Sequence, residues 1–181
     1  EQQFLLLHPV NSSNAYCGAI AKTGPSMTGS SLENFKKKYR GFSSPTIDSA
    51  LSSLVNKEQV LQREIETLSE VTWGKGRTVL IGDASHACAP AMQQGGSQAL
   101  EDALDLAELI TSSNTFVGMA EKLESLRTKR VEFIVNCSNK GTHQAVNMMP
   151  SEIFARNELI RKNGLENFNL WHKIFNEITE N

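Results

Sequence analysis

The sequence predicts a mixed α/β fold with a partial antiparallel sheet, one strand–turn–helix unit, and helices at the carboxyl end. Near the amino end, two short apolar segments flank a turn-rich connection, Phe4–Leu7 and Tyr16–Ala21. Further on, a β-branched run at Thr78–Gly82 is followed by an acidic residue, a glycine turn and a helical pattern. Apolar residues then recur at helical spacing from Phe116 onward. Together these patterns predict sheet first, a mixed unit in the middle, and helices last.

Composition places the chain among ordinary globular proteins, with 181 residues, 39% hydrophobic and 21% charged. A net charge of −2 argues against nucleic acid or an anionic membrane surface as a partner. The three cysteines, Cys17, Cys88 and Cys137, show neither metal-ligand nor disulfide spacing. They favour reduced thiols and a cytoplasmic setting. No signal peptide or membrane-spanning run is visible, and the start at Glu1 without Met indicates a segment of a longer protein.

Residues 1–72 are predicted to form part of a sheet with accompanying helices. The two amino-terminal segments are expected to pair as antiparallel strands. Ser30 and Glu33 fit a capping box that opens a helix ending near Tyr39. A second helix is expected from Pro45, with one apolar face formed by Ile47, Leu51, Leu54 and Val55.

The run Gln62–Leu68 is ambiguous, because its apolar residues fit both a helical and an alternating pattern. We predict a strand there, since it would rejoin the first sheet.

Residues 73–112 are predicted to be a ligand-binding strand–turn–helix unit. Trp73–Gly76 forms the turn into a buried strand at Thr78–Gly82, and Asp83 follows directly. A carboxylate at the carboxyl end of a strand, facing glycines at a helix start, is how α/β proteins hold a polar cofactor. The helix is expected to begin at Ser97, with these apolar residues at helical spacing: Leu100, Ala103, Leu104, Ala107 and Ile110.

Residues 113–181 are predicted to be helical. The first helix is expected to continue to about Asn139, with a break over Lys140–Pro150. Ser151 is expected to cap a last helix that is interrupted near Asn163–Gly164. Its aromatic tail, which includes Trp171 and Phe175, suits either a partner helix or the chain's own core, and we favour the core.

The central unit resembles the second flavin-binding motif of the FAD-dependent single-component monooxygenases, of which para-hydroxybenzoate hydroxylase is the type member. The resemblance rests on GDASH at 82–86, Pro90, and QGGSQALEDA at 94–103, with Trp73 and Gly76-Arg77 before them. It extends more weakly over the rest of the chain, as the carboxy-terminal half of such an enzyme. It implies a fold of the para-hydroxybenzoate hydroxylase type, with 1–72 as part of its substrate-domain sheet.

The resemblance also implies a cofactor, a reaction and a site. The cofactor is FAD, with NAD(P)H as co-substrate and O2 as oxidant, and a flavin C4a-hydroperoxide hydroxylates an aromatic or other activated small molecule. The implied cofactor-binding residues are Gly82, Asp83, Pro90, Gln94, Gly95, Gly96 and Ser97. Asp83 would accept a hydrogen bond from the ribityl chain, and Gly95 and Gly96 would let backbone N–H groups approach the flavin. No protein side chain is expected to be catalytic, and no metal is expected.

The chain departs from the family pattern in two respects. Gln93 stands where the family commonly has Gly, close to the expected flavin edge, and Ser97 replaces a common Asn or Cys. No Gly-rich βαβ unit for the ADP pyrophosphate is present, which predicts that this chain alone binds FAD weakly or not at all. The missing amino-terminal half or a second copy would be its protein partner. Two alternatives stay open: a non-catalytic scaffold or partner-binding module, and a related FAD-dependent reductase or halogenase.

Overall fold

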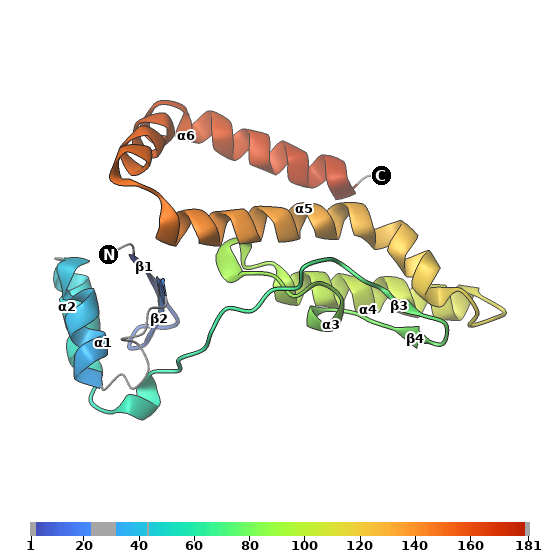
Figure 1. Cartoon of the computed structure of the whole chain (residues 1–181), viewed down its shortest axis with the longest axis horizontal. Helices are drawn as coiled ribbons and strands as arrows, with labels where there is room; N and C mark the ends of the chain where they lie inside the picture. The colour runs from blue at the N-terminus through green and yellow to red at the C-terminus, as the bar shows by residue number, and fades with distance from the viewer. Residues whose placement is uncertain (1–2, 23–31, 43, 180–181) are drawn as a thin grey trace. The chain divides into compact units, whose positions relative to one another are not determined.

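The computed structural model describes residues 3–22, 32–42 and 44–179 (Figure 1). Helices predominate, and the strands are short. In chain order the elements are β1 Gln3–Pro9, β2 Ala15–Ala21, α1 Leu32–Tyr39, η2 Arg40–Phe42, α2 Pro45–Ser53, η3 Lys57–Gln59, β3 Gly74–Lys75, β4 Thr78–Val79, α3 Asp83–His86, η4 Pro90–Met92, α4 Gly95–Ser112, α5 Met119–Asn147 and α6 Pro150–Thr179.

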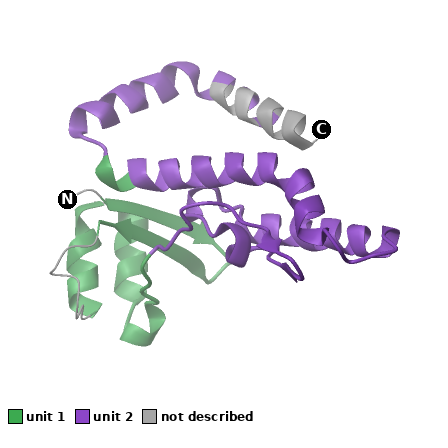
Figure 2. Cartoon of the chain, turned by 45° about the vertical axis from the view of Figure 1, so that its right-hand side comes forward, with its two compact units in different colours: residues 1–64, 145–147 green, residues 65–144, 148–181 purple. Residues whose placement is uncertain are grey.

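The chain divides into two compact units, coloured separately in Figure 2. Unit 1 comprises residues 1–64 and 145–147, and unit 2 comprises residues 65–144 and 148–181. The functional regions 1–72, 73–112 and 113–181 stay a prediction, because compactness alone does not test them.

In unit 1, β1 and β2 form the predicted antiparallel hairpin, with Leu6 opposite Gly18 in the register. The Asn11 side chain closes the connection by accepting hydrogen bonds from the backbone N–H groups of Ser13 and Asn14, at 2.9 and 2.8 Å. This is the local bonding that makes Asn common in tight turns. The hairpin prediction is confirmed.

Both predicted helices of unit 1 are present. The expected cap Ser30 lies outside the described residues, and α1 runs from Leu32. Pro45 occupies the first turn of α2, where its missing N–H costs no hydrogen bond. Leu51 is the buried residue of that helix, whereas Val55, beyond its end, is exposed. The expected apolar face is therefore shorter than predicted.

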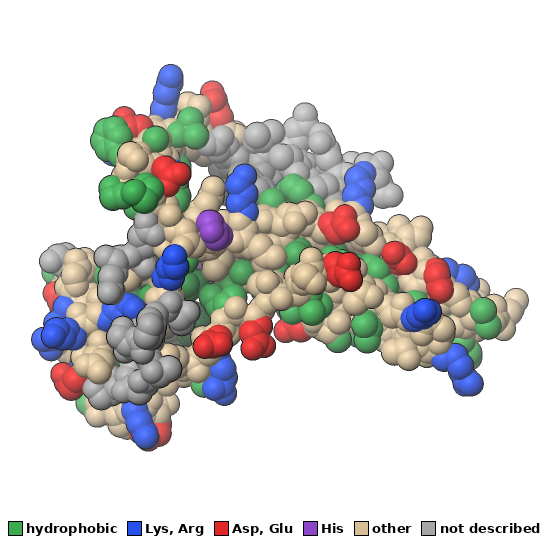
Figure 3. All heavy atoms as spheres, viewed as in Figure 1, with side chains coloured by type: hydrophobic (Ala, Val, Ile, Leu, Met, Phe, Trp, Pro, Cys, Tyr) green, Lys and Arg blue, Asp and Glu red, His purple; other side chains and the backbone are tan. Residues whose placement is uncertain are grey.

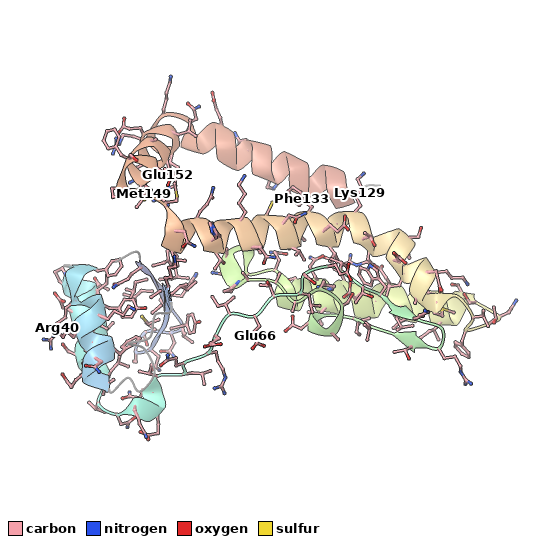
Figure 4. All side chains as sticks on the ribbon, in the orientation of Figure 1. Arg40, Glu66, Lys129, Phe133, Met149 and Glu152 are labelled. Carbon is pink, nitrogen blue, oxygen red and sulfur yellow. The ribbon has the colours of Figure 1, made fainter. Side chains whose placement is uncertain are left out.

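The predicted strand at Gln62–Leu68 is wrong. Every residue of this stretch is exposed, and none pairs with another strand in the part of the chain that is described. Glu66, labelled in Figure 4, belongs to it. Alternating side chains favour a strand only where a neighbouring strand accepts the backbone hydrogen bonds. The chain instead runs extended until the Leu68 N–H donates to the Ala87 carbonyl at 3.0 Å.

The predicted buried strand at Thr78–Gly82 is also shorter than expected. Only Thr78 and Val79 pair, with β3 across the turn, and Ile81 is exposed. The run has the composition of a buried strand, but the described residues supply no further strand beside it.

Helix α4 begins at Gly95, two residues before the predicted start. The apolar residues at helical spacing do not form its buried face. Leu100 and Leu104 are exposed, and the fully buried positions are Gln98 and Asp102. The inward side is polar because charged partners on α5 satisfy it, as described below.

Helix α5 buries several of the apolar positions of its helical pattern, and three of them have 0 to 1% of their surface exposed: Leu123, Val131 and Ile134. Leu126, in contrast, is 58% exposed. Leu123 and Val131 form a cluster with Trp73, against which Leu106 and Leu109 of α4 pack. Lys129 and Phe133, labelled in Figure 4, lie on the opposite side of the helix. The cluster of Trp73, Leu123 and Val131 is the core of unit 2.

The predicted break over Lys140–Pro150 is wrong for most of its length, because α5 continues to Asn147. Gly141 lies inside the helix despite its low helix propensity, and its contacts explain why. The next helix, α6, begins at Pro150 rather than after Ser151.

The predicted interruption of α6 is confirmed as a local kink, since Asn163 has non-helical φ and ψ of −124° and 15°. The side chains of Trp171 and Phe175 lie outside the described part, so the role of the tail stays a prediction. Across the described residues, no helix combines the length and hydropathy that crossing a bilayer demands. Acidic and basic side chains are interspersed on the face shown in Figure 3.

Candidate flavin-contacting site

The predicted site residues occupy consecutive pieces of one connected segment in unit 2. Gly82 precedes α3, Asp83 is the first residue of α3, and Pro90 is the first residue of η4. Gln94 is the N-cap of α4, and Gly95, Gly96 and Ser97 form the first turn of that helix. Asp83, Pro90, Gly96 and Ser97 are exposed.

Gly82 makes the tight turn that presents Asp83. Its φ of 58° lies in the region that favours glycine. A Cβ at Gly82 would lie 3.1 Å from the Cβ of Ala99, so the turn and α4 are in close contact. The Gly82 N–H donates to the Asp102 carboxylate at 2.9 Å. The hydrogen bond to the buried Asp102 thus fixes the turn, while the Asp83 side chain stays exposed.

The start of α4 offers hydrogen-bond donors beside the Asp83 acceptor. The first backbone N–H groups of a helix have no partner within it, and no side chain caps this end among the described residues. A Cβ at Gly95 would lie 4.0 Å from Asp83 Oδ1, and a Cβ at Gly96 would meet no atom within 4 Å. A polar group could therefore reach these N–H groups and the carboxylate together.

Gln93 adopts a left-handed conformation, with φ 53° and ψ 29°. Among the described residues it is the one non-glycine residue with positive φ. A residue with a side chain adopts this conformation less readily than glycine does. The conformation therefore fits the glycine that is common at this position in the family that the motif resembles. The Gln93 side chain is exposed, so its conformation is set by the turn between η4 and α4.

Asp102 is the centre of a buried polar network beneath the site. It has no exposed surface, and its Oδ2 accepts from both Gly82 N–H and His86 Nε2, the latter at 2.7 Å. Its Oδ1 accepts from Arg127 Nε at 2.9 Å. Burial alone would raise the pKa of Asp102, but these hydrogen bonds outweigh it and lower the pKa. Because the carboxylate is an acceptor, His86 Nε2 must carry a proton.

Arg127 joins Asp102 to two further side chains of α4. It donates to Glu101 at 2.7 Å and to Gln98 Oε1 at 2.8 Å. Arg130, one helical turn further, donates to both Glu101 oxygens at 2.7 and 2.9 Å. Burial would raise the pKa of Glu101, but its hydrogen bonds with Arg130 and Arg127 lower it. Burial would lower the pKa of Arg127, but its hydrogen bonds with Glu101 and Asp102 raise it. Each charge therefore stays ionised and partnered.

Trp73 connects the same network to α5. Its ring lies against that of His86, with centroids 5.7 Å apart, and its Nε1 donates to Thr128 Oγ1 at 2.8 Å. Both rings are buried. The His86 ring is thereby held between an aromatic face and a carboxylate.

Sequence reasoning placed Glu101, Asp102, Arg127 and Arg130 on helices but missed the network they form. One signal was available. Gln98, Asp102 and Asp105 recur at the three- and four-residue spacing of one helix face, opposite Leu100 and Leu104. Such a polar face can be solvated or paired, and the sequence contains no sign that it meets Arg127.

Comparisons with known proteins identify the fold and the family of the chain. A crystal structure of a variant of HpxO from Klebsiella pneumoniae in complex with FAD shares the fold, with a TM-score of 0.77 and 21% identity, over 90% of this chain and 43% of that chain. The fold is thus an FAD-binding fold of the para-hydroxybenzoate hydroxylase type, as predicted. The FAD binding domain family matches residues 4–137, and the chain belongs to that family.

Curated relatives resemble shorter stretches. A zeaxanthin epoxidase from an Oncidium hybrid cultivar is 40% identical over 86 residues, which are 44% of this chain and 13% of the epoxidase. The 2-heptyl-3-hydroxy-4(1H)-quinolone synthase of Pseudomonas aeruginosa is 35% identical over 108 residues, which are 56% of this chain and 26% of the synthase. A 3-amino-4-hydroxybenzoate 2-monooxygenase of Streptomyces platensis is 38% identical over 73 residues, covering 40% and 18%. The chain thus spans about a quarter or less of the length of these relatives.

Proposed function

We propose that this chain supplies the ribityl- and pyrimidine-contacting part of an FAD pocket in a flavin-dependent monooxygenase. The observation that carries the proposal is the juxtaposition of the exposed Asp83 carboxylate with the uncapped start of α4 at Gly95 and Gly96. FAD has hydroxyl donors along its ribityl chain and acceptors on its pyrimidine edge, so it needs this pairing of acceptor and donors. Family membership supports the same reading.

Each residue has a distinct part in this proposal. Asp83 accepts a hydrogen bond from a ribityl hydroxyl, and Gly82 holds the turn that places it. The N–H groups of Gly95, Gly96 and Ser97, with the positive end of α4, favour the electron-rich pyrimidine edge. Pro90 limits the motion of the loop beside the ring system, and Gln94 sets where the helix begins.

The reaction proposed for the whole enzyme would convert a substrate C–H bond to C–OH with NAD(P)H, a proton and O2, giving NAD(P)+ and water. When bound, FAD supplies the electron transfer and the oxygen activation, while the protein orients the reactants and excludes water. The substrate class we propose is an aromatic or similarly activated small molecule. The three cysteines are free thiols, which supports a reducing, cytoplasmic setting.

The test is a titration of FAD fluorescence with the 181-residue chain and with Asp83→Ala. We expect weak but saturable binding, and a loss of about 1–3 kcal/mol on substitution, the scale of one hydrogen bond to a charged group. Asp48→Ala is the matched control. It also removes an exposed carboxylate, but Asp48 belongs to unit 1, whereas Asp83 belongs to unit 2. Absence of saturable binding would contradict FAD binding by this chain. Equal affinity of the parent and Asp83→Ala would remove Asp83 from the site.

A second candidate is a partner-binding module, favoured by one observation. Leu100 and Leu104 of α4 are 69% and 71% exposed at adjacent positions of one helix face. A chain that binds no FAD but forms a specific complex through this face would support that candidate. A related FAD-dependent reductase or halogenase would instead bind FAD and consume NAD(P)H without forming hydroxylated product.

A further inference from the structure

The loop between α3 and α4 is held against α5 by two different contacts. The Ala89 N–H donates to Asn139 Oδ1 at 2.9 Å, and Ala89 is buried. Two residues further along each segment, Ala91 packs against Gly141 so closely that a Cβ at Gly141 would lie 3.0 Å from the Ala91 Cβ. A polar anchor and a steric one thus act on one short loop.

The two contacts lie at opposite margins of the buried face of α5. Because a helix turns by about 100° per residue, Asn139 and Gly141 flank the inward-facing Ser138. Ser138 has no exposed surface. The loop is therefore attached to α5 on both sides of Ser138.

Gly141 lies inside a long helix, where glycine costs about 1 kcal/mol relative to alanine. Carbon atoms in favourable contact are about 3.5–4.0 Å apart, so an alanine would force the loop outward. Space for Ala91 explains a helix-weakening residue at this position. Gly141 therefore lies within the stretch predicted as a break, yet α5 continues through it.

We propose that Asn139 and Gly141 are positioning residues that fix the Ala89–Gln93 loop, and through it Pro90 and the start of α4. This inference rests on the proposed FAD site, because it assigns a purpose to the loop position. Neither residue is one of those proposed to contact the cofactor. They act by determining where the loop lies.

Cys88 provides a reporter that needs no cofactor. It precedes Ala89, and its side chain is half-buried. Burial, together with the nearby charge of Asp83, raises the pKa of its thiol, and the neighbouring Ser138 hydroxyl only partly opposes this effect. Both properties slow reaction with a thiol reagent such as DTNB while the loop is docked. With Cys17 and Cys137 replaced by serine in the 181-residue chain, the labelling rate measures release of the loop.

Asn139→Ala should accelerate Cys88 labelling by about tenfold, the upper range for loss of one hydrogen bond. Asn139→Asp retains an acceptor for the Ala89 N–H and should stay as slow as the parent. Gly141→Ala should also accelerate labelling, yet leave Tm unchanged or raised, because alanine is the better helix former. Lys140→Ala, which alters an exposed neighbour, is one control. Gly164→Ala is the other, since its new methyl would meet nothing closer than 3.8 Å.

The FAD titration separates this inference from the proposed function. If the parent binds FAD, Asn139→Ala and Gly141→Ala should each weaken binding several-fold while both controls match the parent. Unchanged labelling in these two variants would overturn the positioning role, whatever the FAD result. Faster labelling with unchanged FAD affinity would overturn it too, because the loop position would then not matter to the site. If the parent binds no FAD, the proposed function fails, and the labelling rates alone decide whether the pair fixes the loop.

Discussion

The fully buried residues of α4 are polar, whereas most of those of α5 are apolar. Helix α5 turns Leu123, Val131 and Ile134 inward, as its apolar periodicity predicts. Helix α4 turns Gln98 and Asp102 inward and leaves Leu100 and Leu104 exposed. Both sequences have helical periodicity, so periodicity identified the helices correctly and the buried face correctly only once.

The difference follows from what each face meets. The inward side of α4 faces Arg127, which satisfies Gln98, Glu101 and Asp102 with hydrogen bonds of 2.7 to 2.9 Å. A buried polar side chain is tolerated only when it is bonded in this way. Helix α5 therefore supplies the apolar core of unit 2 and also the cation that makes a polar face on α4 possible.

The largest effect on this contrast should come from Asp102→Ala. The substitution leaves Arg127, His86 and the Gly82 N–H without a shared acceptor. Removing one partner of a buried charged pair costs about 3–5 kcal/mol, which we expect as the loss in free energy of unfolding by urea denaturation. Asp102→Asn, which keeps the shape and one acceptor, should lose less. A loss below about 1 kcal/mol for Asp102→Ala would mean that the network contributes little to stability.

Acid should weaken the same network without a mutation. The pKa of Asp102 and that of Glu101 are both lowered in the folded chain, so the unfolded chain binds protons more readily. Their contribution to stability is complete above the unfolded values near pH 4 and is lost as the pH falls through the folded values. At pH values below about 4, the urea concentration at the unfolding midpoint should therefore decrease as the pH is lowered. The decrease per pH unit should be smaller in Asp102→Asn. Equal pH slopes in the two proteins would show that Asp102 is not the group responsible.

The smallest effect should come from Leu104→Ala on the exposed side of α4. Leu104 is 71% exposed, and surface substitutions usually change stability by less than about 0.5 kcal/mol. The matched control is Leu123→Ala on α5, where the side chain has no exposed surface and the cost should be about 2–5 kcal/mol. Similar losses at both positions would show that the apolar side of α4 is covered in solution.

Sequence alone predicted much of the secondary structure but less of the packing. The hairpin and helices α1, α2, α4 and α5 follow local patterns that survive folding. The strand at Gln62–Leu68 and the full length of Thr78–Gly82 depend on a neighbouring strand, which no local pattern reveals. The break predicted over Lys140–Pro150 is absent up to Asn147, and a stretch that contains glycine can still be helical where the glycine makes a close contact, as Gly141 does with Ala91.

The candidate site shows the same limit. The motif containing Asp83 and Gly95 is contiguous in sequence, so its residues could be proposed without a structure. Asp102, Arg127 and Asn139 act across 20, 25 and 50 residues of sequence separation, and a single sequence does not show such pairings.

The bond from Gly82 to Asp102 makes α4 part of both sides of the candidate site. The donors at Gly95 and Gly96 begin this helix, and Asp102, seven residues after Gly95, holds the turn that presents Asp83. The spacing between acceptor and donors is therefore set by about 10 Å of helix rather than by a flexible loop. Because this separation is fixed, we expect the site to favour ligands whose donor and acceptor groups are the same distance apart. Little conformational entropy of the protein would be lost when such a ligand binds.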